Sequence, residues 1–296
     1  VIAFFFNWEY LTAVIRFGSA RDIPATASAP NRQGKPGGYL TVATYNVHNF
    51  GNEITGYSCK EIARYMRQQH VDVLCFQEFG GNKHFTADSL RRALSHWQYA
   101  LIPADDSIRG LLPIAVFSRY PLTGGRFITY PHSSNCSMLC DIVAGTDTIR
   151  LLNNHLQTTG VSRNRKKWER ELTTDNTRRE AQAVQDAAET LHENFVKRAA
   201  QTDSICHLAI AAPHPVLVCG DFNSLPSSYT YRRLSGFLED GFKTGGHGYM
   251  YTYRYGKRML RIDYAFHSPE LECIDYYSPD LDLCSDHNPV IFTVKR

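Results

Sequence analysis

The stretch Val216–Pro226, V-L-V-C-G-D-F-N-S-L-P, sets the expectations for the whole chain. Its apolar run ends at Gly220, as a buried strand does where it reaches the edge of a sheet. Asp221 and Asn223 follow two residues apart, so on an extended chain both side chains would leave that edge in one direction. The carboxylate could orient a water or take its proton, and the carboxamide could hold a phosphate oxygen. An ordinary Asp-Phe-Asn turn after a strand fits the same letters, so other motifs must decide between the two interpretations.

The composition is that of a globular protein. The 296 residues are 43% hydrophobic and 21% charged, which supplies enough apolar material for one large domain or two small ones. A net charge of +3 is too small to indicate a nucleic-acid partner by itself. The eight cysteines form no C-x-x-C pair, and Cys75 and Cys219 lie inside apolar runs. We therefore expect mostly small buried side chains and no zinc site, and the even number leaves a disulfide open.

The chain divides into three parts. Residues 1–17 are mostly apolar but fall short of the roughly 20 residues that span a bilayer, and Trp8 and Tyr10 suit a membrane interface. A truncated membrane anchor, an interfacial helix and an ordinary docked helix all fit this segment. Residues 18–38 are rich in proline, glycine and alanine, which predicts a linker before a main domain of residues 39–296.

The main domain alternates strand-like and helix-like stretches. The predicted strands are 39–47, 71–79, 99–103, 112–118, 126–130, 136–144, 148–156, 216–219, 249–255, 261–267, 271–277 and 288–294. The predicted helices are 58–69, 86–97, 162–200 with an interruption at 173–177, and 227–234. Ser58 and Glu61 form a capping-box pattern at the start of the first helix. Many strands with helices spaced among them predict an α/β fold with mixed sheets.

Polar residues with chemical capability recur where these strands end. They are Asn46, Glu78, His155, Asp221, Asn223, Asp263, Asp286 and His287. Oxygen ligands without cysteine favour Mg²⁺ or Mn²⁺ over zinc, and Glu78 with one or two further oxygens would leave metal positions open for phosphate and water. Asp263 could orient His287 as a carboxylate does in a hydrolytic triad.

Taken in order, the motifs Y-N-V, Q-E, N-H-L, G-D-F-N, R-I-D-Y and S-D-H-N-P-V resemble the endonuclease/exonuclease/phosphatase superfamily from about Leu40 to the C-terminus. The sequence is also similar to a bacterial subgroup with N-terminal membrane helices, which carries H-L-Q and P-x-S-Y, here at residues 155–157 and 226–229. The resemblance implies a four-layered α/β sandwich, in which two mixed β-sheets pack face to face with helices on the outside. Residues 39–296 would then be a metal-dependent phosphoesterase domain.

The same resemblance implies Mg²⁺-dependent hydrolysis of a phosphate ester by in-line attack of water. On the metal side, the resemblance implies that Glu78 would be the main ligand and that Asn46 and Asp286 would belong to the shell of the metal and its waters. Asp221 would orient or deprotonate the attacking water, and Asn223 would hold a phosphate oxygen.

The resemblance gives the two histidines complementary roles. His287, steadied by Asp263, would contact the scissile phosphate and stabilise its charge. His155 would bind the phosphate or protonate the leaving oxygen.

The substrate stays open between phosphodiesters and phosphomonoesters. A DNA or RNA nuclease of the same fold would need a continuous basic track, and the basic run in residues 163–170 fits either a phosphate-binding ridge or a solvated helix face. A catalytically silent binding protein is the alternative from another class, although such a protein would be expected to have lost at least one motif. If the N-terminal segment is an anchor, the protein is membrane-associated and leans extracytoplasmic, and a soluble cytoplasmic protein stays open.

Overall fold

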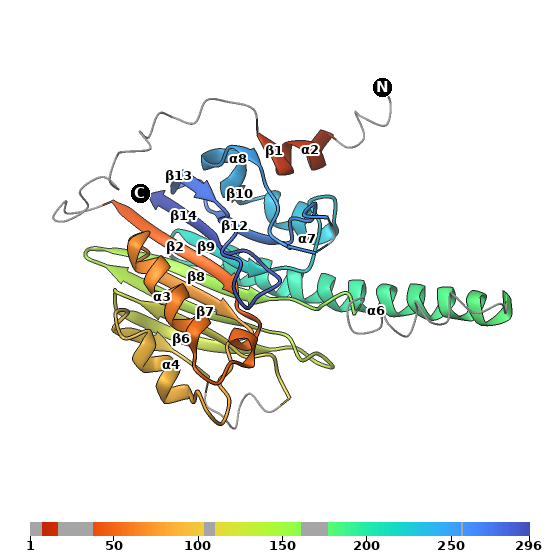
Figure 1. Ribbon diagram of the computed structural model, residues 1–296. Coiled ribbons are helices and arrows are strands. Elements are labelled where there is room, and N and C mark those ends of the chain that lie inside the picture. The colour runs from red at the N-terminus through yellow and green to blue at the C-terminus, as the bar shows by residue number, and fades with distance from the viewer. Residues whose placement is uncertain (1–7, 17–37, 104–109, 161–176, 256) are drawn as a thin grey trace.

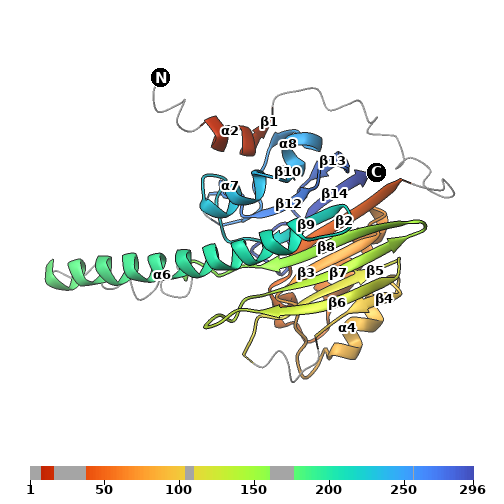
Figure 2. The same ribbon diagram turned by 180° about the vertical axis from the view of Figure 1, so that it is seen from behind.

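The computed structural model describes residues 8–16, 38–103, 110–160, 177–255 and 257–296. Its main body holds two six-stranded sheets (Figures 1 and 2). The first sheet has the order β13 (Glu272–Tyr277), β14 (Val290–Lys295), β2 (Tyr39–Asn46), β3 (Val73–Gln77), β5 (Ile114–Ser118) and β4 (Tyr99–Leu101). The second has the order β10 (Glu239–Asp240), β12 (Asp263–His267), β9 (Val216–Asp221), β8 (Asp147–His155), β7 (Cys136–Ala144) and β6 (Leu122–Thr129).

Helices cover the outer face of each sheet. The first sheet is covered by α3 (Tyr57–Gln68) and α4 (Ala87–Ala93), and the second by α6 (Thr177–Ile210) and α7 (Tyr229–Ser235). Two outer apolar clusters join helices to sheets, and a third joins the sheets to each other. The predicted four-layered sandwich is therefore confirmed. Helix α6 extends well beyond the sheets in both views (Figures 1 and 2).

Each sheet has one parallel pair near its centre. In the first, β2 runs parallel to β3 and pairs Asn46 with Gln77 at the end of both strands. In the second, β8 runs parallel to β9 and pairs His155 with Asp221, again at the ends. Because parallel strands end at the same edge, each pair brings its last polar residues together. The other strand neighbours in both sheets are antiparallel.

A polar pair, Gln77 at the end of β3 and Asn153 two residues before the end of β8, joins the two sheets. Gln77 Nε2 donates to Asn153 Oδ1 at 2.6 Å, and Asn153 Nδ2 donates to the carbonyl oxygens of Phe76 and Ala115, each at 3.1 Å. Both side chains are fully buried. The bonds cross from one sheet to the other, so they set the position of β3 against β8 where both strands approach the site.

Glycine is required before Asp221 because the β8 backbone leaves no room for a side chain there. Gly220 has φ +137°, and a Cβ there would lie 1.9 Å from the carbonyl oxygen of Asn154 on β8. Any side chain at Gly220 would push β8 and β9 apart beside the His155–Asp221 pair.

Three predictions of local structure are wrong. Helix α3 begins at Tyr57 with Gly56 as its N-cap, and Ser58 bonds to Glu53 instead of capping, because the chain before the helix turns back and presents that carboxylate. Residues 249–255 do not form one strand: only Tyr249 lies in a strand, β11 (Gly248–Tyr249). Helix α6 continues to Ile210, ten residues past the predicted end. The basic run of residues 163–170 lies outside the described residues.

The described part of the N-terminal segment packs on the main body. A short helix α2 (Trp8–Val14) leads into β1 (Ile15–Arg16), which pairs with β11. Arg16 Nη1 donates to the carbonyl oxygens of Thr244 and Gly246, beside α8 (Gly241–Gly245), at 2.6 and 2.8 Å. Among the described residues no helix is long and apolar enough to cross a bilayer, so the expected membrane helices and membrane association gain no support. All eight cysteines are free, and seven are buried.

Candidate active site

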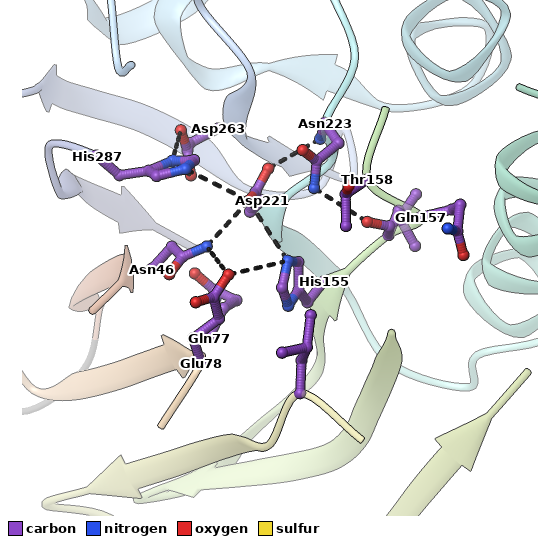
Figure 3. A network of polar contacts seen from close by, with 12 residues as sticks. Asn46, Gln77, Glu78, His155, Gln157, Thr158, Asp221, Asn223, Asp263 and His287 are labelled. Atoms are coloured by element: carbon purple, nitrogen blue, oxygen red, sulfur yellow. Dashed lines mark hydrogen bonds and ion pairs between the residues drawn. The ribbon is translucent and has the colours of Figure 1, made fainter. Parts of the chain in front are cut away.

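Side chains from both sheets meet beyond the two parallel pairs (Figure 3). Asn46 lies between two carboxylates: its Nδ2 donates to Glu78 Oε1 at 3.2 Å and to Asp221 Oδ2 at 3.1 Å. Asn46 and Asp221 are buried, whereas the Glu78 side chain is 18% exposed. Asn46 of the first sheet thus links the Glu78 carboxylate, which follows β3, to the Asp221 carboxylate at the end of β9. The structure brings these three predicted residues together.

Glu78 is held in its ionised form. Burial raises the pKa of Glu78, but the hydrogen bond from His48, the charge of His155 and the bond from Asn46 outweigh it and lower the pKa to about 2. Glu78 has φ 49°, a left-handed conformation that costs energy for a residue with a side chain. Its carboxylate therefore stays charged near neutral pH and faces the centre of the group.

His48 is a site residue that the sequence analysis missed. Its Nδ1 lies 3.4 Å from Glu78 Oε2, its backbone N–H donates to Asn46 Oδ1 at 3.1 Å, and its side chain is 53% exposed. It begins η1 (His48–Asn52), in which all five residues have positive φ. The only available signal was a histidine two positions after Asn46, and that spacing indicates proximity only if the chain turns sharply there.

His155 faces the same two carboxylates from β8. Its Nε2 lies 3.6 Å from Asp221 Oδ2 and 3.8 Å from Glu78 Oε1. The side chain is buried, and its Nδ1 has no hydrogen-bond partner within the described residues. An imidazole with one unused ring nitrogen at this position can exchange a proton with a bound group.

Asp263 and His287 form a buried dyad. His287 Nδ1 lies 2.9 and 3.1 Å from the two carboxylate oxygens of Asp263, and His287 Nε2 lies 3.7 Å from Asp221 Oδ2. Burial lowers the pKa of His287, but the charges of Asp263 and Asp221 outweigh it and raise the pKa to about 10. His287 is therefore a cation at neutral pH, held between two carboxylates. Burial also raises the pKa of Asp221, which the His287 charge opposes.

Asn223 reaches the site by a turn. Its backbone N–H donates to Asp221 Oδ1 at 2.8 Å, and its φ is 48°. The Asp-Phe-Asn turn is thus real, and it carries Asn223 to the site, so the two interpretations of this stretch are compatible. The Asn223 side-chain nitrogen donates to the carbonyl oxygen of Leu156 at 3.0 Å, and its second N–H makes no hydrogen bond within the described residues.

What indicates that Asp286 lies near the site is its charge, and not a hydrogen bond. Its charge raises the pKa of both His48 and His287, so it lies near the site. Within the described residues its side chain makes no hydrogen bond or ion pair with the other predicted residues. The neighbouring Ser285 Oγ donates to the Asn46 carbonyl oxygen at 2.6 Å, which fixes the loop that carries Asp286 and His287.

A buried cation lies behind the two loops that leave β8 and β9. Arg198 of α6 donates from Nε to the Gln157 carbonyl oxygen at 2.7 Å and from Nη1 to Ser224 Oγ at 3.2 Å. Burial lowers the pKa of Arg198 to about 10, although the charge of Asp221 opposes the shift. Its third nitrogen, Nη2, has no hydrogen-bond partner within the described residues. Arg198 therefore supports the loop segments that follow His155 and Asn223.

Residues 43–287 match the sequence model of the Endonuclease/Exonuclease/phosphatase family. The chain belongs to this family. No curated protein matches the sequence.

Solved structures agree with the family assignment. An endonuclease/exonuclease/phosphatase from Bacteroides vulgatus is 16% identical, with a TM-score of 0.61 over 86% of this chain and 98% of its own. One from Beutenbergia cavernae DSM 12333 is 16% identical, with a TM-score of 0.60 over 87% of this chain and 72% of its own. TDP2 from D. rerio, complexed with a single-strand DNA product, is 13% identical, with a TM-score of 0.60 over 87% of this chain and 99% of its own. At these identities the likeness establishes the endonuclease/exonuclease/phosphatase fold and nothing finer.

The donors of the site suit a hard divalent cation. Glu78 offers an ionised, partly exposed carboxylate, and Asp221 offers a second one linked to it through Asn46. Carboxylate oxygens are the ligands that Mg²⁺ and Mn²⁺ prefer. Asn46 presents its nitrogen to both carboxylates, so in this arrangement its amide bridges them and its oxygen is bonded to the His48 backbone.

A second group could hold a metal by distance alone. One ligand atom each from Asp221, Asp263 and His287 lie within 4.8 Å of one another, and all three residues are buried. In this group the Nδ1 of His287 is already hydrogen-bonded to Asp263, and the raised pKa keeps the imidazole protonated. A protonated imidazole does not bind a metal. The donor chemistry therefore favours the Glu78 side of the site.

Proposed function

We propose that this chain is a divalent-metal-dependent hydrolase of phosphate esters, in which an activated water attacks the phosphorus in line. The observation that carries the proposal is the meeting of Glu78, Asp221 and His287 in one connected group, together with His155. Phosphoryl transfer needs mainly positioning and charge stabilisation, and this group combines carboxylates, a fixed cation and amide donors. The family assignment supports the same reaction class.

Glu78 would be the main metal ligand, with Asn46 and Asp286 in the shell of the metal and its waters. Mg²⁺, or Mn²⁺, would supply a Lewis acid that polarises the phosphoryl oxygens. Asp221 would orient the attacking water and take its proton, because it is the carboxylate between the two histidines. The positions of the Glu78 and Asp221 carboxylates support their roles, whereas the roles of Asn46 and Asp286 rest on the resemblance to the family.

The remaining residues would stabilise charge and move a proton. His287, kept cationic by Asp263, would face the charge that develops on the phosphorus oxygens. Asn223 would donate its remaining N–H to a phosphate oxygen. His155, with one ring nitrogen unused, would bind the phosphate or protonate the leaving oxygen. A DNA or RNA nuclease of the same fold is the second candidate, and the exposed Tyr255 ring, which lies next to the Tyr253 ring that contacts His287, favours it.

Hydrolysis of bis-p-nitrophenyl phosphate and p-nitrophenyl phosphate, each with Mg²⁺, Mn²⁺ or a chelator, tests the proposal. We expect metal-dependent turnover that Glu78→Gln reduces by at least about 10²-fold, because it removes the charged ligand. Glu53→Gln is a matched control, since Glu53 bonds to Ser58 at the start of α3, and this variant should keep its turnover. Turnover that survives the chelator, or wild-type activity in Glu78→Gln, would contradict the metal assignment.

A further inference from the structure

The two members of the buried dyad come from different sheets. Asp263 is the first residue of β12 in the second sheet, whereas His287 lies in the loop before β14 of the first sheet. The 2.9 Å contact between them therefore depends on how these two segments are placed relative to each other. The bond between Gln77 and Asn153 joins β3 to β8, so it fixes a different pair of strands. The dyad requires a further connection, between β12 and the loop before β14.

Thr252 provides such a connection. Its hydroxyl oxygen accepts hydrogen bonds from the backbone N–H groups of Ile262 and Asp263, each at 3.0 Å. Its carbonyl oxygen accepts a hydrogen bond from the backbone N–H of Asn288, the residue after His287, at 2.7 Å. The residue is completely buried. Thr252 thus holds the backbone on both sides of the dyad, through its side chain on one side and its main chain on the other.

The two residues after Thr252 contact the loop that carries His287. Tyr253 forms an isolated β-bridge with His287, and its ring lies edge-on to the imidazole, with centroids 5.2 Å apart and planes at 69°. The Arg254 backbone N–H donates to the Asp286 carbonyl oxygen at 2.8 Å. These main-chain contacts tie the stretch firmly to the loop, so the hydroxyl of Thr252 is the group that joins this stretch to the start of β12.

The oxygen of the side chain is what this position requires. A hydroxyl oxygen has two lone pairs, so it can accept both N–H groups at once. Valine has nearly the shape of threonine but no oxygen, and it would leave both N–H groups without this acceptor. A buried N–H group without a partner is costly, so the start of β12 would shift towards another acceptor.

We infer that Thr252 is a positioning residue, which holds Asp263 and His287 at the separation that aims the imidazole at the phosphate. The inference rests on the proposed function for its effect on the reaction, whereas the placement of the dyad can be measured without turnover. Thr252 acts through the backbone of its neighbours and not on the substrate. A misplacement of about 1 Å in a catalytic group can lower a rate by about 10²-fold, so the effect should be large.

Replacements of Thr252 separate the oxygen from the rest of the side chain. On bis-p-nitrophenyl phosphate with Mg²⁺ or Mn²⁺, kcat should fall by about 10- to 10²-fold in Thr252→Val, and KM should change less. Thr252→Ser keeps the oxygen and should retain kcat to within about threefold. Thr252→Cys, whose sulfur is a weak acceptor, should lie between the two. This third variant also tests the inference if Thr252→Val does not fold.

The matched control is Thr293→Val. Thr293 of β14 is a buried threonine whose hydroxyl lies 3.0 Å from that of Thr41, near the end of β2 opposite Asn46. Its replacement also removes a buried hydroxyl from the protein. It should leave kcat within about twofold of the wild type, because no contact links it to the dyad within the described residues.

Proton NMR in a chelating buffer reports the dyad directly. His287 is a cation at neutral pH, so its Nδ1 carries a proton that donates to Asp263. This proton should give a low-field resonance that is absent in His287→Gln. We expect the resonance to be shifted or broadened in Thr252→Val and Thr252→Cys, and unchanged in Thr252→Ser and Thr293→Val. A merely structural role for Thr252 would lower the Tm and leave the resonance in place.

Three results would overturn the inference. They are wild-type kcat in Thr252→Val or Thr252→Cys, an unchanged resonance in those variants, and a loss of kcat in Thr252→Ser as large as in Thr252→Val. Failure of the proposed function is distinguishable from all three. In that case the wild type cleaves neither nitrophenyl ester with either metal, while the resonance still responds to the loss of the Thr252 oxygen.

Discussion

The replacement of Asp263 by Asn isolates the charge of the buried dyad. The carboxamide has nearly the size of the carboxylate, so the packing around His287 is kept while the negative charge 2.9 Å from its Nδ1 is lost. In the wild type, burial lowers the pKa of His287 while Asp263 and Asp221 together raise it to about 10. After Asp263→Asn only Asp221, with its oxygen 3.7 Å from Nε2, opposes the burial. We therefore expect the pKa of His287 to fall by several units, towards or below its ordinary value of about 6.5.

The expected loss of activity follows from this shift. If the cationic imidazole stabilises the transition state, kcat at pH 8 should fall by about 10²–10⁴-fold, the range measured for removing such a group. That corresponds to about 3–5 kcal/mol at 1.36 kcal/mol per factor of ten. A raised pKa means that activity is lost as the pH rises through the value in the folded protein. The wild type should therefore keep its activity to higher pH than Asp263→Asn, whose alkaline limb moves to lower pH.

The stability of the folded protein should depend on pH in the same direction as the activity. A histidine whose pKa is raised on folding stabilises the protein fully below about 6.5, and this stabilisation is lost as the pH rises through about 10. The Tm of the wild type should fall across this window, and that of Asp263→Asn should fall less. Both proteins are measured by pH–rate profiles on bis-p-nitrophenyl phosphate and by thermal unfolding.

A second histidine–carboxylate pair, whose histidine lies on the same strand as Asp263, provides the control. His267 of β12 is buried with its Nε2 3.9 Å from Glu239, and neither residue contacts the site. Glu239→Gln should leave kcat and the alkaline limb unchanged. A wild-type kcat and an unmoved alkaline limb in Asp263→Asn would refute the assigned role of the dyad.

Three further predictions concern the structures that hold the site. Gly220→Ala should destabilise the protein by about 3 kcal/mol or more in urea unfolding, because its Cβ would meet the β8 backbone at 1.9 Å; an unchanged urea midpoint would contradict the packing. Arg261 and Asp240 form a fully buried ion pair, with Nη2 2.6 Å from Oδ1. Arg261→Met should cost about 3–5 kcal/mol of stability because the Asp240 carboxylate is left buried without its cation, and adding Asp240→Leu should restore most of that stability. No recovery in the double variant would contradict that cause. The double variant Gln77→Leu with Asn153→Leu should stay within about 2 kcal/mol of wild-type stability, but its kcat should fall on the order of tenfold. Full activity in this variant would show that the polar pair is not needed to position the site.

Much of the site could be predicted from sequence because its residues lie where strands end. Asp221 and His155 end neighbouring parallel strands, and Glu78 follows the end of the matching pair in the other sheet. Alternation and an apolar run ending in a polar residue are local patterns, so they survive in the sequence. That these edges face each other across two sheets is not local, and here the resemblance to the family supplied what periodicity could not.

The path of the chain at the site could not be predicted, for a different reason. His48, which was missed, has positive φ, as do the predicted residues Glu78 and Asn223, and such turns redirect a side chain in a way that spacing along an extended chain cannot anticipate. Residues 249–255, of which Tyr253 lies next to His287, were predicted as one strand, because Tyr249, Tyr251 and Tyr253 alternate with other residues as strand residues do. Alternation indicates a strand only where a neighbour pairs with it, and after Tyr249 this stretch has isolated bridges instead.

The site depends on polar contacts inside the apolar layer between the two sheets. Glu78 and Asn46 belong to the first sheet, whereas His155 and Asp221 belong to the second, so any sliding of one sheet over the other would separate them. Apolar contact between sheets resists separation but has little directional preference. The bond between the sheets below the site is directional and short, so it selects one offset. Burying two amides costs stability compared with an apolar pair, and the return on that cost is a fixed distance between the carboxylates of the two sheets. The position of the predicted metal and of the phosphorus beside it would therefore be set by residues one and two positions before Glu78 and His155, before any ligand binds.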